Sequence, residues 1–303
     1  MTDPARNPAL TSDAPPAHAR RSTPGIGLLF VLLWSTGFIG AKLGLPYAEP
    51  LTFLALRMGF VVALLLVVAV VARAPWPHDA RSWVHIVIAG LLVQCGYLGG
   101  VFSAIHQGMS AGVVALIVGL QPILTAVVAA PLFGERTTSR QWIGLVLGLV
   151  GVALVLSNNL THGTINAAGF ILACIALLSI TAGTLYQKRF GATMDFRTGA
   201  VIQYASTGLV LLLLASLTES MHVTWSGQFI FALAWLALVL SVGAISLLYF
   251  LVKRGKATQV SSLFYLTPPV TAVLAFLFFG ETLSPTALVG MAIAVIGVAL
   301  VNR

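Results

Sequence analysis

Two stretches of sequence decide the fold: AGVVALIVGLQPILTAVVAAPLFGERTTSRQWIGLVLGLVGVALV at residues 111–155, and its second copy 146 residues later. The second copy, residues 257–301, reads ATQVSSLFYLTPPVTAVLAFLFFGETLSPTALVGMAIAVIGVALV, and 17 of the 45 positions are identical without a gap. Each copy carries a central proline, a Phe-Gly-Glu triplet and a closing Gly-Val-Ala-Leu-Val. Shared apolar composition does not explain so many identities in one register, so the chain is predicted to consist of two repeated halves.

The composition around these repeats places the chain in a membrane. Of 303 residues, 58% are apolar and 8% are charged, whereas a soluble domain has about 25% charged residues. A water-soluble enzyme of ordinary fold is therefore excluded, and a lipid bilayer is the expected surroundings.

Ten apolar runs predict an all-α membrane protein, because a backbone without water must form helices. The expected spans are residues 26–45, 51–72, 83–105, 111–133, 141–157, 167–187, 197–217, 228–252, 257–279 and 285–302. The proline-rich residues 1–24 are predicted to be a disordered cytoplasmic tail. Residues 25–157 then form the first five-helix repeat, and residues 158–303 form the second.

The basic residues predict the orientation. With the N-terminus inside, 14 of the 16 lysines and arginines lie on the cytoplasmic side, and the exceptions are Lys42 and Arg57. Such asymmetry follows the positive-inside rule and places both termini in the cytoplasm. The net charge of +8 is therefore a topology signal, and no nucleic-acid partner is expected.

An odd number of spans in each half turns the second half over in the membrane. Glu135 then lies on the cytoplasmic side and its repeat equivalent, Glu281, lies outside. The two halves are predicted to be inverted repeats, an arrangement typical of secondary transporters that bind substrate near the bilayer midplane.

Several motifs resemble those of a known family. They are the repeated proline and Gly-Glu pattern, Trp34-Ser35-Thr36-Gly37, Lys42-Leu43-Gly44-Leu45-Pro46 and Leu56-Arg57. Over about residues 26–302 the chain resembles the EamA-type permeases of the drug/metabolite transporter superfamily. The resemblance implies a permease of the bacterial inner membrane that moves small molecules. Because better-understood bacterial members export amino acids, including aromatic ones, amino-acid export by alternating access is the expected function.

The candidate substrate-binding residues are polar or aromatic side chains that lie well inside the spans, where each needs a partner or a cavity. They are Trp34, Ser35, Arg57, Gln94, Tyr97, Gln121, Tyr204, Tyr249, Tyr265 and Thr267. For any single aromatic residue among them, core packing is the favoured role. Bonding between helices is as expected as substrate contact for Gln121 and is favoured for Thr267. Arg57 could bind a substrate carboxylate, but a structural pair with Glu49 is slightly favoured.

The prolines Pro122, Pro268 and Pro269 lie near the middle of their spans. A proline removes a backbone donor and disturbs the preceding turn. Their repetition in both halves favours hinges that line a cavity over simple packing kinks.

Other functions stay open from the sequence. The same fold could export drugs or other amphipathic metabolites, or take up substrate. A passive channel is a further class, as is an intramembrane enzyme, although Cys95, Cys174, His85 and His106 show no nucleophile–base pair or metal cluster. No phosphate-binding loop is present, so no ATP-binding domain in the chain and no cofactor are expected. A small-molecule substrate is expected, and the sequence does not determine the oligomeric state.

Overall fold

The computed structural model describes residues 23–109, 114, 117–134, 136–155, 157, 166–191, 195–254, 257–279 and 283–302. Residues 1–22 of the predicted tail, together with Glu135 and Glu281, lie outside this description. The helices of the first half are α1 (Thr23–Gly44), η2 (Leu45–Tyr47), α2 (Pro50–Val71), α3 (Ala80–Gly90), η3 (Leu91–Gly99), α4 (Gly100–His106), α6 (Gln121–Phe133) and α7 (Ser139–Val155). Those of the second half are α9 (Ala167–Phe190), α10 (Phe196–Thr218), α11 (Gly227–Trp235), η4 (Leu236–Ala244), α12 (Ile245–Arg254), α13 (Ala257–Ser262), η5 (Leu263–Leu266), α14 (Thr267–Phe279) and α15 (Pro285–Asn302).

The described part of the chain is an all-helical bundle in which eight helices are long and apolar enough to cross a membrane. The helices α6 and α7, with 13 and 17 residues, are shorter apolar helices. They fall on the fourth and fifth predicted spans, so the count of ten spans stays a prediction. The outer surface is apolar, with Val71, Leu209 and Leu217 at least 70% exposed. A surface of this kind suits hydrocarbon, and the chain is a multi-pass membrane protein.

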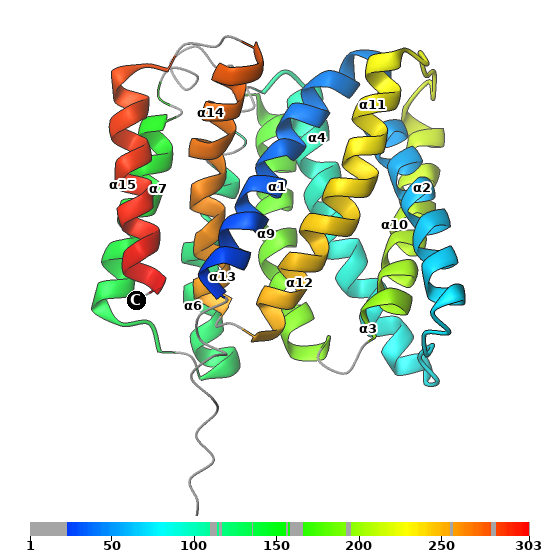
Figure 1. Cartoon of the computed structure of the whole chain (residues 1–303), viewed down its shortest axis with the longest axis horizontal. Helices are drawn as coiled ribbons and strands as arrows, with labels where there is room; N and C mark the ends of the chain where they lie inside the picture. Colours follow the sequence, from blue (N-terminus) through cyan, green and yellow to red (C-terminus); the bar gives the residue numbers. More distant parts are fainter. Residues whose placement is uncertain are drawn as a thin grey trace, which may run out of the picture.

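The helices α7 and α15 cross in direct backbone contact at one edge of the bundle (Figure 1). A Cβ atom on Gly144 would lie 2.6 Å from the Gly297 oxygen, and one on Gly151 would lie 2.7 Å from the Gly290 oxygen. The start of α7 therefore meets the end of α15, so the two helices are antiparallel. Gly144 and Gly151 correspond to Gly290 and Gly297 in the sequence repeat, so the contacts are reciprocal. If the two halves are inverted repeats, equivalent helices that contact each other must be antiparallel and their contacts reciprocal, as those of α7 and α15 are.

The third helix of each half contains a π-helical segment at nearly the same place. In the first half it is η3, and in the second half it is η4, which begins 145 residues later. The Ser241 hydroxyl donates to the Leu236 oxygen five residues back, at 3.1 Å, which is the spacing of a π turn. Wide turns of this kind are frequent at functional sites, and both segments lie beside the cavity described below.

Apart from the buried Arg57, two groups of charged side chains lie at opposite ends of the bundle. One end, named here the basic end, carries Arg73, Arg81, Lys188, Arg189, Arg197, Lys253 and Arg254. Contacts join these segments: the Thr198 hydroxyl donates to the Pro75 oxygen, and the Tyr249 hydroxyl donates to the Gly191 oxygen. The opposite end, named here the acidic end, carries Glu49 and Glu219.

At the acidic end, two carboxylates tie α2 to α10 reciprocally. Glu49, just before α2, accepts hydrogen bonds from the backbone N–H and the hydroxyl of Ser220 at 2.7 and 2.6 Å. Glu219, just after α10, accepts from the N–H groups of Leu51 and Thr52 at 2.7 Å each and from the Thr52 hydroxyl. The Ser220 bonds hold the pKa of Glu49 below its usual value. The stability that this contact adds is therefore present at neutral pH and is lost as the pH falls through that lowered pKa.

We expect the substitution Glu219→Ala to lower the free energy of unfolding by about 1 to 2 kcal/mol, because it removes the side-chain cap from the first turn of α2. The measurement is the thermal unfolding midpoint of the purified full-length protein. Glu219→Gln retains one carbonyl acceptor and is expected to lose less. An unchanged midpoint for both variants would show that water replaces the cap without cost.

Candidate functional site

A cavity opens among α1, α2, η3, α4 and η4. It encloses about 680 Å³ of empty space, part of which is continuous with the exterior. Its lining is Trp34, Gly37, Ala41, Leu45, Arg57, Val93, Gln94, Tyr97, Leu98, Val101, Phe102, Ile105, Leu240 and Ile245. The cavity thus runs from the middle of α1 to its end beside Tyr47, at the acidic end. It is large enough for a small organic molecule.

Arg57 brings a positive charge into this mainly apolar lining. Its side chain is 2% exposed, and its Nε donates to the Ser241 hydroxyl at 2.9 Å. Pairing with Glu49, favoured by the sequence, is wrong, because the Glu49 carboxylate binds Ser220 instead. Among the described residues no carboxylate forms an ion pair with Arg57. A buried cation with a single neutral partner is costly, and its guanidinium has five N–H donors, so it can bind a further acceptor.

Aromatic rings form the side of the cavity that faces the basic end. The ring of Trp34 is stacked with that of Tyr97, with 6.4 Å between centroids. It also meets Phe264 edge-on at 5.3 Å, and both Trp34 and Phe264 contact Phe30, one turn nearer the start of α1. An aromatic cluster therefore lies beside the cavity toward the basic end, while the lining at the other end reaches Leu45, near the acidic end.

The structure brings four predicted site residues to the cavity: Trp34, Arg57, Gln94 and Tyr97. The amide nitrogen of Gln94 is buried and has no hydrogen-bond partner among the described residues, so it is a second donor available to a ligand. Tyr204 lies behind them, where its hydroxyl donates to the Ser241 carbonyl at 2.8 Å. Ser241 thus joins Tyr204 to Arg57.

The other predicted site residues lie outside the cavity lining. Tyr249 is at the basic end, bonded to Gly191, and the Tyr265 ring packs where a Cβ atom on Gly148 would be only 2.3 Å away. Ser35 donates to the oxygens of Val31 and Thr267 at 2.7 and 3.3 Å, joining α1 to α14. Gln121 is likewise buried outside the lining.

The three prolines lie at the starts of α-helical segments, and those of the second half lie inside the continuous apolar span Thr258–Phe278. Pro122 lies in the first turn of α6, and Pro268 and Pro269 lie in the first turn of α14. A first-turn residue has no intrahelical N–H partner, so proline is accepted there without loss of a bond. The prolines mark places where helical segments begin, and their role as hinges stays a prediction.

Sequence reasoning missed Ser241, whose hydroxyl accepts a hydrogen bond from Arg57. It also missed the apolar lining residues such as Leu240. One available signal was the lone hydroxyl of Ser241 in the apolar run 236–245. Its direction could not be foreseen, because η4 has a π turn in place of an α turn. In the described part of the chain, no group of histidine, cysteine and acidic side chains could hold a metal ion.

A helical membrane bundle with an apolar cavity and a buried cation has the form of a carrier for small molecules. Two segments, residues 24–157 and 167–303, match the EamA-like transporter family, so the chain belongs to that family. This confirms the resemblance drawn from the motifs.

Relatives across nearly the full length are also named as transporters. The uncharacterized transporter YvbV of Bacillus subtilis is 28% identical over 90% of this chain and 88% of its own length. The uncharacterized inner membrane transporter YedA of Escherichia coli is 27% identical over 93% and 92%. A probable amino-acid metabolite efflux pump of Salmonella typhimurium is 27% identical over 90% and 92%. A crystal structure with a TM-score of 0.79 covers 93% of this chain and 96% of that one at 24% identity, which shows a shared fold.

Proposed function

We propose that the protein is a secondary transporter that exports amino acids with apolar or aromatic side chains across the bacterial inner membrane. The observation that carries this proposal is Arg57, a buried guanidinium that lines an apolar cavity and has no carboxylate partner among the described residues. A substrate carboxylate would supply the missing partner through charge-assisted hydrogen bonds.

The remaining lining suits the other parts of an amino acid. The stacked faces of Trp34 and Tyr97 can attract an ammonium group, and Gln94 adds an amide beside them. Aliphatic and aromatic walls, Val101 and Phe102 among them, suit an apolar side chain. A probable amino-acid metabolite efflux pump among the relatives supports the same substrate class.

Alternating access is the mechanism that we propose, with the two halves as inverted repeats. The antiparallel, reciprocal contacts of α7 and α15 support the inversion, as do the π segments at equivalent positions. The cavity reaches toward the acidic end, and aromatic rings lie beside it toward the basic end. With the basic end in the cytoplasm, as the charges indicate, this structure is outward-facing.

The test is counterflow in proteoliposomes that contain the full-length protein. Vesicles loaded with unlabelled L-phenylalanine should transiently accumulate external labelled L-phenylalanine, and the initial rate should saturate. Leucine should compete, and liposomes without protein should show neither effect. Linear flux that no amino acid competes with would contradict a carrier and indicate a channel. Counterflow of hydrophobic drugs without counterflow of amino acids would instead support a drug exporter.

A further inference from the structure

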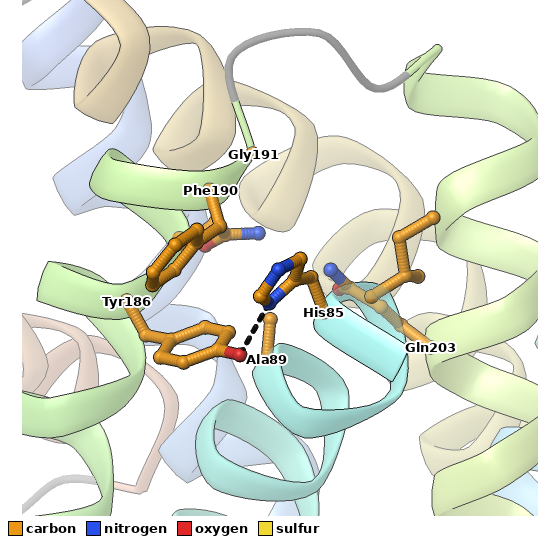
Figure 2. Close-up of a pocket in the computed structure, with 8 residues that line it drawn as sticks. His85, Ala89, Tyr186, Phe190, Gly191 and Gln203 are labelled. Atoms are coloured by element: carbon orange, nitrogen blue, oxygen red, sulfur yellow. Dashed lines mark hydrogen bonds between the residues drawn. The ribbon is translucent and has the colours of Figure 1, made fainter. Parts of the chain in front are cut away.

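A second, smaller pocket lies near the basic end, between α3, α9 and α10. It is narrow in this structure: about 200 Å³ of space between atoms lies there, open solvent included, with room for about one water molecule. Its polar lining includes His85, Tyr186, Gln187 and Gln203. Figure 2 shows the His85 ring between Tyr186 and Phe190 on one side and Gln203 on the other. The Nδ1 atom of His85 lies 2.6 Å from the Tyr186 hydroxyl, and the ring stacks on Phe190 with 4.3 Å between centroids and 6° between planes.

The amide of Gln203 is the unexplained group in this pocket. The side chain is 4% exposed, yet its nitrogen has no hydrogen-bond partner among the described residues. A buried donor without an acceptor destabilises the folded protein, so an acceptor from a ligand would be favoured here. Position 203 is also the repeat equivalent of position 57, so each half places a buried nitrogen donor at this point of its second helix.

The correspondence extends beyond that one position. Gln187 and Gly191 in the small pocket are the repeat equivalents of Ala41 and Leu45 in the large cavity. If the halves are related by inversion, equivalent residues face opposite ends of the bundle. The small pocket therefore occupies, at the basic end, the place that part of the large cavity occupies toward the acidic end.

A single helical turn separates the two pockets. Ala89 lines the small pocket, and Val93, four residues later, lines the large cavity. Close contacts fill the space between them: a Cβ atom on Gly183 would lie 2.6 Å from a Val93 methyl group, and one on Gly90 would lie 2.8 Å from the Gln203 Cα. Gln203 also precedes Tyr204, which reaches Arg57 through Ser241. The two pockets are thus adjacent, and tightly packed side chains and backbone separate them.

We propose that the small pocket is a second binding site for the substrate carboxylate, loaded from the cytoplasm, with Gln203 and His85 as its donors. When the Tyr186 hydroxyl donates to Nδ1 of His85, the ring carries its proton on Nε2, which is then a donor. Together with the amide nitrogen of Gln203, it gives two neutral donors for one carboxylate. A neutral site binds more weakly than Arg57 does, so a substrate is passed on toward the charged site.

The test compares the two faces of the membrane. The KM for labelled L-phenylalanine is measured in inside-out and right-side-out vesicles that carry the full-length protein. Gln203→Met removes the donor at similar size, and we expect the cytoplasmic KM to rise about tenfold while the outer KM stays near its original value. Gln203→Glu has the same shape but repels a carboxylate, so its cytoplasmic KM should rise further.

Two other variants complete the test. His85→Phe retains the stacking on Phe190 but removes the second donor, so it too should raise the cytoplasmic KM. This variant tests the site independently if the Gln203 variants do not reach the membrane. Thr207→Val is the matched control. Thr207 lies one turn along α10 and is fully buried, with no hydrogen-bond partner for its hydroxyl among the residues that the structure describes. It lines neither pocket, so neither KM should change.

The outcomes separate this proposal from the proposed function on which it rests. If the wild-type protein shows saturable flux and the Gln203 and His85 variants leave the cytoplasmic KM unchanged, the second site is overturned and the transporter stands. Equal changes at both faces, or a change confined to the outer face, also overturn it. If no amino acid gives saturable flux, the transporter proposal fails and the second site falls with it.

Discussion

Replacing Arg57 with glutamine is expected to raise the KM for L-phenylalanine about 100-fold, because truncating one partner of a buried charge pair typically costs 2 to 5 kcal/mol. The protein itself should not be destabilised. Arg57 has Ser241 as its hydrogen-bond partner, and removing a buried charge also removes its desolvation cost. We therefore expect the thermal midpoint of Arg57→Gln to match or exceed that of the wild-type protein.

The carboxylate role can be isolated by changing the ligand together with the protein. Phenethylamine is phenylalanine without its carboxylate, so its inhibition constant should be the same in wild-type and Arg57→Gln protein. Such a double-difference experiment isolates the pairwise term. Equal losses for both ligands would mean that Arg57 shapes the cavity and does not bind the carboxylate. Ser241→Ala is the companion variant and should produce a smaller loss, since it frees the guanidinium without removing its charge.

The second large effect is expected at the crossing of α7 and α15. Gly151→Val should lower the free energy of unfolding by about 3 kcal/mol or more, because the added atoms meet backbone that cannot turn aside. A Cβ atom there would lie 2.5 Å from the Ala294 nitrogen. For a chain of 303 residues a loss of this size should lower the thermal midpoint by roughly 5 °C. Gly297→Val should show a similar loss, because Gly297 makes the reciprocal contact.

A matched control exists in α2. Gly59 is exposed, and a Cβ atom on it would meet nothing within 4 Å, so Gly59→Val should leave the midpoint nearly unchanged. The double variant Gly151→Val/Gly297→Val should lose less than the sum of the single losses, because one separation of the helices relieves both clashes. Equal midpoints for Gly151→Val and Gly59→Val would disprove the tight crossing.

Much of the architecture was predictable because hydrocarbon allows few solutions. Long apolar runs without alternation must be helices, and the helices follow the expected runs closely. The same reasoning located Arg57, Gln94 and Tyr97, since polar groups inside such runs need a cavity or a partner. Trp34 was found because an aromatic ring at the centre of a span has no interface to occupy.

The sequence could not tell which buried aromatic residues face the cavity. Tyr97 and Tyr265 both lie inside apolar helices, but the Tyr97 ring stacks with Trp34 beside the cavity, whereas the Tyr265 ring packs over Gly148. The direction of a side chain depends on helix rotation, and a π turn changes that rotation by adding a residue to the turn. Gln203 was missed for a related reason. It becomes a candidate binding residue only when the structure shows that its buried amide nitrogen has no hydrogen-bond partner among the described residues.

The two halves of the chain meet at both edges of the bundle. In Figure 1 the α7–α15 crossing stands at one edge, and α2 packs with α10 at the other, where Glu49 and Glu219 each hold the opposite loop. Each contact joins one half of the chain to the other. Further contacts between the halves lie inside the bundle, among them those of Ser35 with the Thr267 oxygen and of Arg57 with Ser241. The interface between the halves therefore extends from one edge of the bundle to the other, and we expect any movement of one half against the other to disturb the glycine crossing and the carboxylate contacts together.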